Sequence, residues 1–342
     1  MTDDARAGVD LEAAAKAVEL IRDVARTATR PEQVDRVGGF AGLFRIGEGR
    51  LLAAATDGVG TKTEVARMAG RLDTIGVDLV AMCADDVACT GAEPLLFLDY
   101  IAVGRLVPED VAELVEGVAE GCRRAGCALL GGETAEHPGI MEPGRIDLAG
   151  FCVGVVDEDR VIGPHRVGPG DALVGLESTG LHSNGYSLVR RVLLESGAVG
   201  LDETPAELGG RTVAEGLLEP TAIYAPLLAS MAGEGLVSAA AHITGGGIPE
   251  NLARVLPEGT GADVDRGAWT VPPIFEVVRR AGDLSDETMF ETFNMGLGMI
   301  LAVPDRSVRE VLTRAGDGGV RAHVIGRVSG PPGVRLETFG TS

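Results

Sequence analysis

The spacing of apolar positions predicts a chain in which strands alternate with helices. Apolar residues recur at helical spacing over residues 11–26 and again over residues 75–89, which predicts two amphipathic helices. The shorter apolar runs at 51–56 and 95–103 favour buried strands. Pro108, followed by two acidic residues, is typical of the first turn of a helix. Two more strands are expected in this half of the chain, at 127–130 and 146–156.

The composition changes between residues 157 and 170, where charged and turn-forming residues predominate. We therefore predict two domains, residues 1–163 and 164–342. The second half repeats the alternation, with a turn at 178–185 that leads into a helix ending near residue 194. Its other expected helices are 221–232, 247–256, 273–281 and 305–315, and its expected strands are 172–176, 238–243, 298–303, 320–327 and 334–338. The pattern predicts a two-domain α/β or α+β enzyme-like plan.

Charge excludes several classes of function. The chain has 342 residues, 51 acidic and 30 basic, and a formal net charge of −21. An acidic surface repels phosphodiester backbones and anionic lipid, so we expect no nucleic-acid partner and no membrane partner. A protein this acidic that binds phosphates needs local devices such as backbone N–H groups, helix N-termini and metal ions. The hydrophobic share of 45% is sufficient for a sizeable core.

The cysteines favour a reducing compartment. Their number is odd and no Cys-x-x-Cys pair occurs, which is typical of free thiols in the cytoplasm and argues against a zinc site. The simplest interpretation of all five is that they are small buried apolar residues. They are Cys83, Cys89, Cys122, Cys127 and Cys152. The acidic N-terminus leads into no apolar run, so we expect no secretory signal and a cytoplasmic protein.

The segment at residues 56–63, Thr-Asp-Gly-Val-Gly-Thr-Lys-Thr, follows an expected strand and opens an expected helix. At such a junction, glycine N–H groups and the helix N-terminus can face an anion. Asp57 at the end of the strand suits a magnesium ion that bridges phosphate oxygens. The segment lacks the spacing of a Walker A loop. An ordinary strand–turn–helix with Asp57 as a turn former is the alternative.

Acidic residues emerge from the otherwise apolar helix at 75–89. Asp78, Asp85 and Asp86 lie about two turns apart and so share one face. We expect a metal-binding role for at least one of them, although a solvated acidic face is the common alternative. Asp99 within a strand and Glu133 after two glycines could add oxygen ligands. Asp99 is the weaker candidate, because a lone acid in a strand more often satisfies a hydrogen bond.

Two segments of the second half have polar residues at the start of a helix. His182 precedes Ser183, Asn184 and Gly185, whose side chains and backbone can cap the helix or donate to a phosphate. His182 could move a proton near neutral pH, or it could simply pack in a turn. The second segment, residues 244–247, is Thr-Gly-Gly-Gly at a strand–helix junction. Three glycines allow a ligand to approach the backbone closely, or they form a tight left-handed turn.

In this order, these segments resemble the phosphoribosylformylglycinamidine cyclo-ligases, also called aminoimidazole ribonucleotide synthetases. The likeness covers nearly the whole chain. The matching segments are residues 7–10, 38–40, 56–62, 73–83, 91–94, 97–100, 131–136, 149–156, 182–190, 244–247 and 292–294. Of several local departures from the family, one could affect the chemistry: Asp85 stands where the family usually has Asn.

The resemblance implies an ATP-dependent ring closure in purine biosynthesis, in which formylglycinamidine ribonucleotide becomes aminoimidazole ribonucleotide with release of ADP and phosphate. It implies ATP and Mg²⁺ as cofactors. It also implies two α/β domains in an aminoimidazole ribonucleotide synthetase-like fold. In such a fold the N-terminal strands of two subunits form a shared barrel, so we expect a homodimer.

The resemblance also implies roles for individual residues. Magnesium and the nucleotide phosphates would be bound by Asp57, Asp86 and Glu133. The nucleotide-side anion loop would consist of Gly58, Gly60, Thr61 and Lys62. Substrate phosphate or amide groups would be held by Ser183, Asn184, Gly185, Thr244, Gly245, Gly246 and Gly247. His182 would be the proton carrier, so the expected catalytic residues are His182, Asp57 and Asp86.

Two other functions stay open from the sequence. One is another ATP-using enzyme of the same superfamily, such as a thiamine-monophosphate kinase. A selenide water dikinase is disfavoured, because such enzymes carry a reactive Cys or selenocysteine near the N-terminus and the first cysteine here is Cys83. The other is a non-catalytic acidic scaffold that retains the fold.

Overall fold

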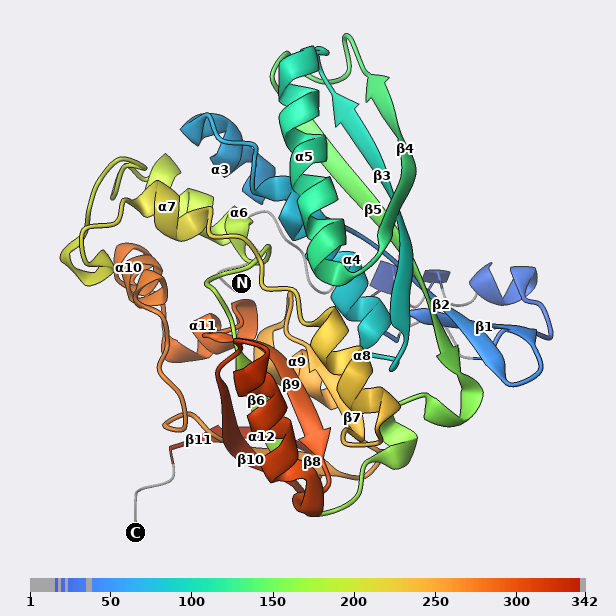
Figure 1. Cartoon of the computed structure of the whole chain (residues 1–342). Helices are drawn as coiled ribbons and strands as arrows, with labels where there is room; N and C mark the ends of the chain where they lie inside the picture. The colour runs from blue at the N-terminus through green and yellow to red at the C-terminus, as the bar shows by residue number, and fades with distance from the viewer. Residues whose placement is uncertain (1–15, 18–19, 22–23, 35–38, 339–342) are drawn as a thin grey trace.

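The computed structural model describes the chain except for residues 1–15, 18–19, 22–23, 35–38 and 339–342. Two β-sheets lie side by side, one from each half of the chain (Figure 1). The first has the strand order β1-β2-β5-β3-β4, with β3 and β4 parallel and the other neighbours antiparallel. Its strands are β1 (Gly42–Gly47), β2 (Arg50–Gly58), β3 (Glu93–Val103), β4 (Ala128–Glu136) and β5 (Ile146–Asp157).

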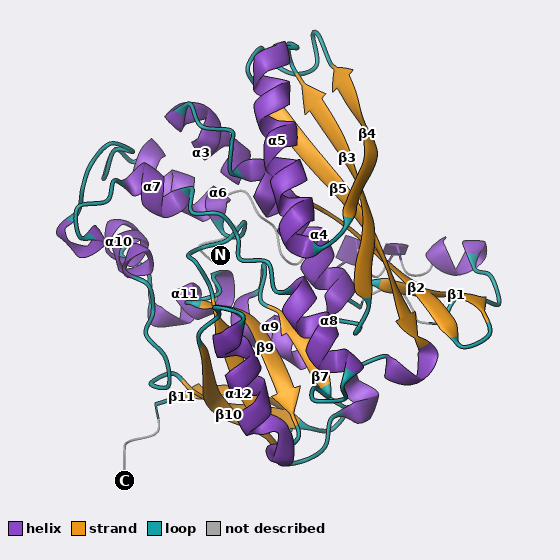
Figure 2. Ribbon diagram, in the orientation of Figure 1, coloured by secondary structure: helices purple, strands orange, loops and turns teal. Residues whose placement is uncertain are grey.

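Helices α4 (Ile75–Ala88) and α5 (Pro108–Ala125) cover one face of this sheet (Figure 2). Every second residue of β2 points toward them, so Leu51, Ala53 and Ala55 are buried. α4 is buried almost throughout, because it packs between the sheet, α5 and the second half of the chain. Helix α3 (Lys62–Ala69) follows β2 and leads to α4.

The second sheet has the order β11-β8-β10-β6-β9-β7. All seven residues of its strand β9 are buried, as expected for a strand that is covered on both faces. Its strands are β6 (Ala172–Glu177), β7 (Ala239–His242), β8 (Gly261–Asp265), β9 (Leu297–Val303), β10 (Ala322–Ser329) and β11 (Gly333–Glu337). The helices of this half are α6 (Tyr186–Val189), α7 (Val213–Leu217), α8 (Ala225–Gly233), α9 (Gly247–Ala253), α10 (Pro273–Gly282), α11 (Asp286–Thr292) and α12 (Val308–Asp317).

The two halves meet where α8 packs against α4 and β3. Close to this junction lie the loop after β2, the loop between β6 and α6, and the loop between β7 and α9. The predicted division at residues 163 and 164 falls in the connection between β5 and β6 and stays a prediction.

The two-domain α/β plan is confirmed, and most expected elements occur close to their predicted bounds. The prediction missed four short elements, β1, β8, α7 and α11, whose five to seven residues carry little periodicity. The helix expected to end near residue 194 is a single turn, α6, followed by a π-helical segment at Arg190–Glu195. The described residues of the helix at 11–26 are mostly helical, and its other residues lie outside the described part of the chain. Among the described residues, no helix has the length and apolarity needed to span a membrane.

Candidate active site

A buried ion pair connects the two halves of the chain. Lys62, in the first turn of α3, and Asp78 on α4 both have fully buried side chains. The Lys62 Nζ lies 2.8 and 2.9 Å from the two carboxylate oxygens of Asp78. It also donates to the carbonyl oxygens of His182 and Glu219, at 2.9 and 3.0 Å. Asp78 in turn accepts hydrogen bonds from the backbone N–H and the hydroxyl of Thr221.

The environment of Lys62 opposes the predicted role of its side chain. All three N–H groups of the ammonium have partners, and none is directed into the loop that precedes α3. Burial lowers the pKa of Lys62 and raises that of Asp78, while the attraction between the two charges opposes both shifts. The assignment of Lys62 to the nucleotide-side anion loop stays a prediction. Its side chain fixes the loops around residues 182 and 219.

The predicted glycine segments line one cavity of about 210 Å³ between the halves. Gly60 and Thr61 come from the first half, and Ser183, Asn184 and Gly185 come from the second. The cavity is completed by Tyr186, Ser187, Leu188, Gly245, Gly246 and Thr292. The Thr61 and Ser187 hydroxyls lie 3.1 Å apart, and the Gly245 N–H donates to the Asn184 side-chain oxygen at 3.0 Å. The structure thus brings together the residues expected on the nucleotide side and those expected on the substrate side.

Two backbone positions, one in this cavity and one beside it, require glycine. Gly185 has φ +76°, and a Cβ there would lie 2.2 Å from the Phe293 ring. Gly247 has φ +60°, and its Cβ would meet the Phe290 carbonyl oxygen at 2.0 Å. Asn251 holds the glycine segment from the next turn of α9, because its amide donates to the carbonyls of Gly245 and Gly247. Thr244 and Gly247 lie beside this cavity and do not line it.

Asp57 and Asp86 form a second part of the site. Asp57 ends the buried row of β2 and accepts a hydrogen bond from the Gly58 N–H at 2.7 Å. Burial raises the pKa of Asp57, and the negative charge of Asp86 adds to this effect. Asp86 binds the Nδ1 of the buried His242 at 2.9 Å. Burial lowers the pKa of His242, but the hydrogen bond and charge of Asp86 outweigh this and raise it overall.

In the sequence, the pair formed by Asp57 and Asp86 is connected to residues that line the cavity. Asp57 precedes Gly60 by three residues, and His242 precedes Gly245 by the same number. α4 supplies the third connection, because the Met82 sulfur, one turn before Asp86, contacts the Asn184 amide at 4.0 Å.

Glu133 does not join this pair within one subunit. In the first sheet, Asp57 is paired with Gly150, which is paired with Asp99, so both carboxylates lie on the face covered by α4. Glu133 is paired with Tyr100, one position along, and therefore lies on the opposite, exposed face. Burial raises the pKa of the half-buried Asp99. Within the described residues, no group of three or more His, Cys, Asp or Glu side chains is arranged to hold a metal ion.

His182 is placed in a structural position. Its side chain is fully buried, and its Nε2 accepts the backbone N–H groups of Thr179 and Ala222 at 3.3 and 3.4 Å. Burial lowers the pKa of His182 well below its usual range, and the charges of His242 and Lys62 lower it further. Its Nδ1 has no hydrogen-bond partner within the described residues. The role of His182 as proton carrier stays a prediction.

Asp85 is a buried carboxyl beside the acidic pair. One of its oxygens accepts the Tyr224 N–H at 2.8 Å, and the other has no partner within the described residues. Burial raises the pKa of Asp85 to about 7, although His242 and the backbone N–H groups of Tyr224 and Ala225 oppose this. The side chain joins the start of α8 to α4.

Sequence reasoning missed His242, Asn251 and Thr221 as parts of the site. His242 stands two residues before the start of the Thr-Gly-Gly-Gly segment, and Asn251 stands one turn after its end. These positions in the sequence could have indicated both residues. Nothing in the sequence indicates Thr221, because its partner Asp78 is 143 residues away.

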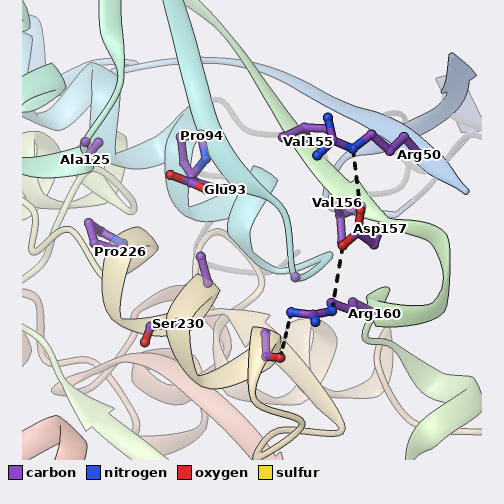
Figure 3. A pocket seen from close by; sticks show the side chains of 14 residues that line it. Arg50, Glu93, Pro94, Ala125, Val155, Val156, Asp157, Arg160, Pro226 and Ser230 are labelled. Atoms are coloured by element: carbon purple, nitrogen blue, oxygen red, sulfur yellow. Dashed lines mark hydrogen bonds and ion pairs between the residues drawn. The ribbon is translucent and has the colours of Figure 1, made fainter. Parts of the chain in front are cut away.

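A larger cavity in the described part of the chain lies elsewhere. It has a volume of about 460 Å³ and extends from the start of β2 to the last turn of α8. Asp157 binds Arg50 at 3.6 Å and Arg160 at 3.8 Å on its wall (Figure 3). Arg50 begins β2 and Asp57 lies near its end, so about 23 Å of strand separates this cavity from the acidic pair. It contains none of the predicted site residues.

Residues 38–156 match the family described as AIR synthase related protein, N-terminal domain, and residues 168–338 match its C-terminal domain. The phosphoribosylformylglycinamidine cyclo-ligase of Symbiobacterium thermophilum is 49% identical, with 97% of each chain covered. The one from Myxococcus xanthus is 51% identical, with 96% of each chain covered. The chain belongs to the phosphoribosylformylglycinamidine cyclo-ligase family.

Solved structures share the fold of this family member at low sequence identity. A thiamine-monophosphate kinase from Stenotrophomonas maltophilia K279a aligns with a TM-score of 0.63 and 18% identity, over 93% of this chain and 95% of that one. Phosphoribosylformylglycinamidine synthase II from Thermotoga maritima aligns with a TM-score of 0.60 and 18% identity, over 89% of this chain and 44% of that one.

The departure at Asp85 gives a prediction for the pH dependence of stability. The pKa of Asp85 is about 7 in the folded protein, well above its ordinary value of 3.8. The stability that the neutral carboxyl provides is therefore fully present below pH 4 and is lost as the pH rises through 7. Asp85→Asn keeps an acceptor for the Tyr224 N–H and removes the buried charge. We expect the variant to exceed the natural protein in free energy of unfolding by about 1 kcal/mol or more at pH 8, and by less at pH 5.

Urea unfolding at both pH values, in the presence of a chelator, measures this difference. Asp202→Asn, at an exposed position, is the control and should change stability by less than about 0.5 kcal/mol. A gain from Asp85→Asn that is equal at the two pH values would show that the carboxyl does not titrate in this range.

Proposed function

We propose that this protein is an ATP-dependent cyclo-ligase that closes the imidazole ring of formylglycinamidine ribonucleotide, with release of ADP and phosphate. One observation carries the proposal. The loop before α3 and the loops before α6 and α9 line a single cavity between the halves, next to the pair formed by Asp57 and Asp86. An enzyme that transfers a phosphoryl group between two ligands needs such a junction, and the family relatives are named for this reaction.

Backbone groups supply much of the proposed phosphate binding. Gly60, with φ +61°, turns the chain just before α3, whose N-terminus carries a partial positive charge. Gly58 and Gly60 leave the backbone open to phosphate oxygens on the nucleotide side. On the other wall, Asn184 and Gly246 can contact the substrate. These donors bind anions without adding positive charge to an acidic protein.

Asp57 and Asp86 fit a magnesium ion. They are carboxylates close enough for Asp86 to raise the pKa of Asp57. Mg²⁺ is commonly bound by one or two carboxylates together with phosphate oxygens and water, so two protein ligands suffice. When bound, the ion would neutralise negative charge on the transferred phosphoryl group. His242 orients Asp86 through its Nδ1 and is a positioning residue.

The chemistry explains why ATP is needed. The oxygen of the substrate's formamide group is a poor leaving group. Transfer of the γ-phosphoryl group to that oxygen turns it into phosphate, and attack by the amidine nitrogen then closes the five-membered ring. The proposed role of the cavity is to hold both ligands in line for the transfer and to exclude water from it.

A thiamine-monophosphate kinase function is the weaker alternative. The solved kinase shares the fold at 18% identity, whereas cyclo-ligases are 49% and 51% identical over nearly the whole chain. We also propose that the protein acts in the cytoplasm, where free thiols persist. The thiols that the structure describes are all free.

The second proposal is a homodimer formed through the exposed face of the first sheet. Tyr100 and Phe151 lie on the face away from α4, each with an exposed fraction of 40%. Leu95 and Leu130 add apolar surface at bulges in β3 and β4, with exposed fractions of 43% and 64%. An apolar sheet face of this kind is typical of an interface. A dimer would also bring Glu133, on the same face, close to the partner.

Phe151→Arg should convert the dimer to a monomer, because it places a charge in the proposed interface. Light scattering after gel filtration measures the mass. Val324→Arg is the matched control, since Val324 is an exposed apolar residue on β10 of the other sheet. A mass that is unchanged by Phe151→Arg would exclude this face as the interface.

The enzymatic proposal predicts magnesium-dependent release of ADP only when formylglycinamidine ribonucleotide is present. Asp57→Asn should lower turnover by at least about tenfold, which corresponds to about 1.4 kcal/mol. Asp147→Asn is the matched control, because Asp147 lies on the neighbouring strand and also accepts the N–H of the residue after it. Its turnover should be unchanged. Equal hydrolysis of ATP with and without the substrate would contradict the cyclo-ligase assignment.

A further inference from the structure

Two cysteines lie at the C-terminal end of α5, at positions whose side chains face each other. Gly126, with φ +73°, ends the helix. The Cys127 N–H donates to the Cys122 carbonyl at 3.0 Å, and the Gly126 N–H donates to the Arg123 carbonyl. These two hydrogen bonds define a Schellman motif, in which the side chains at the positions of Cys122 and Cys127 usually form an apolar contact. Here this contact is between two thiols.

A third cysteine, Cys152, interacts with the Cys127 sulfur as well. Interactions with Cys122 and Cys152 lower the pKa of the Cys127 thiol, and the same interactions raise the pKa of the Cys122 and Cys152 thiols. Cys122 and Cys152 are buried, whereas Cys127 is partly exposed. Cys127 is therefore the member of the group that combines thiolate character with access to solvent, which is the combination that makes a cysteine reactive.

The group lies outside the proposed active site. Ala125 and Gly126, within the Schellman turn, line the 460 Å³ cavity at the far end of the first sheet (Figure 3). None of the three cysteines lines the cavity that holds the glycine segments. Their chemistry is thus available without any part in ring closure.

We propose that Cys122 and Cys127 form an oxidative modification site that closes to a reversible disulfide in the presence of hydrogen peroxide. The Cys127 thiolate attacks one peroxide oxygen, which gives a sulfenic acid and hydroxide. The Cys122 sulfur then attacks the sulfenic sulfur, the S–S bond forms, and water leaves. Two thiols are oxidised by two electrons, and the peroxide is reduced to two water molecules.

Cys122 is the resolving partner because the helix end can adjust. A disulfide needs its two Cα atoms within about 7 Å and its Cβ atoms directed toward each other. The Schellman motif already supplies this proximity between Cys122 and Cys127. Cys152 lies on the central strand β5, whose backbone is fixed by β2 on one side and β3 on the other. A bond from Cys152 to Cys127 would require that strand to move.

Peptide mapping of the peroxide-treated protein tests the proposal directly. Trypsin cleaves after Arg123 and Arg124, so Cys122 and Cys127 fall in separate peptides that only a disulfide can join. We expect the two peptides to be joined by a disulfide, with a mass that is two hydrogen atoms lower than the sum of the separate peptides. Dithiothreitol should separate them. A joined pair that contains Cys152 with Cys127, or recovery of Cys127 as an unreacted thiol, would overturn the proposal.

Variants separate the roles of the three thiols. Cys127→Ser should abolish the reaction, and Cys122→Ser should stop it at a sulfenic acid that dimedone traps on Cys127. Cys152→Ala should still give the joined pair. Cys89→Ser is the control, because the buried Cys89 contacts Met299 and not this group. If the natural protein forms the disulfide but Cys122→Ser gives no dimedone adduct, the attack does not begin at Cys127.

Discussion

A buried ammonium must find an acceptor for each of its N–H groups, and this requirement organises the junction between the two halves of the chain. Lys62 meets it with one carboxylate and two backbone carbonyls. Asp78 comes from the first half, and the carbonyls of His182 and Glu219 come from the second. Removal of one partner from such a pair leaves an uncompensated buried charge. The pair therefore holds the two walls of the cavity in one arrangement.

The same arrangement explains how an acidic protein can handle phosphates. Its net charge of −21 would repel them, and the ammonium of Lys62 is already neutralised by Asp78. Under the proposed function, the attraction comes from backbone N–H groups at the glycine segments and from a cation held by Asp57 and Asp86. Gly185 and Gly247 have left-handed conformations, and Phe293 and Phe290 leave no room there for a Cβ, so both positions need glycine.

The sequence predicted the two-domain α/β plan and the segments that form the cavity, because glycines at strand–helix junctions have a direct local meaning. Glycine is needed where the backbone turns into a helix at positive φ, and this need is visible within a few residues. Thr61 and Asn184 were correctly singled out as neighbours of these junctions, and both line the cavity.

The direction and burial of individual side chains could not be predicted in this way. Lys62 turns inward because Asp78 and two carbonyls lie beneath α3, and those partners are 16 to 157 residues away. The pKa of His182 is lowered because the folded chain excludes water from its side chain. Glu133 lies on the opposite face from Asp57 because of the strand register, and a shift of one position reverses the face. These properties depend on tertiary contacts that no local pattern contains.

Hydrogen–deuterium exchange of Lys62→Met tests the central claim most directly, with Arg67→Met in the exposed part of the same helix as the reference. If the Lys62–Asp78 pair holds the two walls together, exchange should become faster at residues 179–186 and 219–222 and stay unchanged in α12 and β10. Arg67→Met should exchange like the natural protein. Unchanged protection of these two segments in Lys62→Met, or an equal increase over the whole chain, would contradict the account.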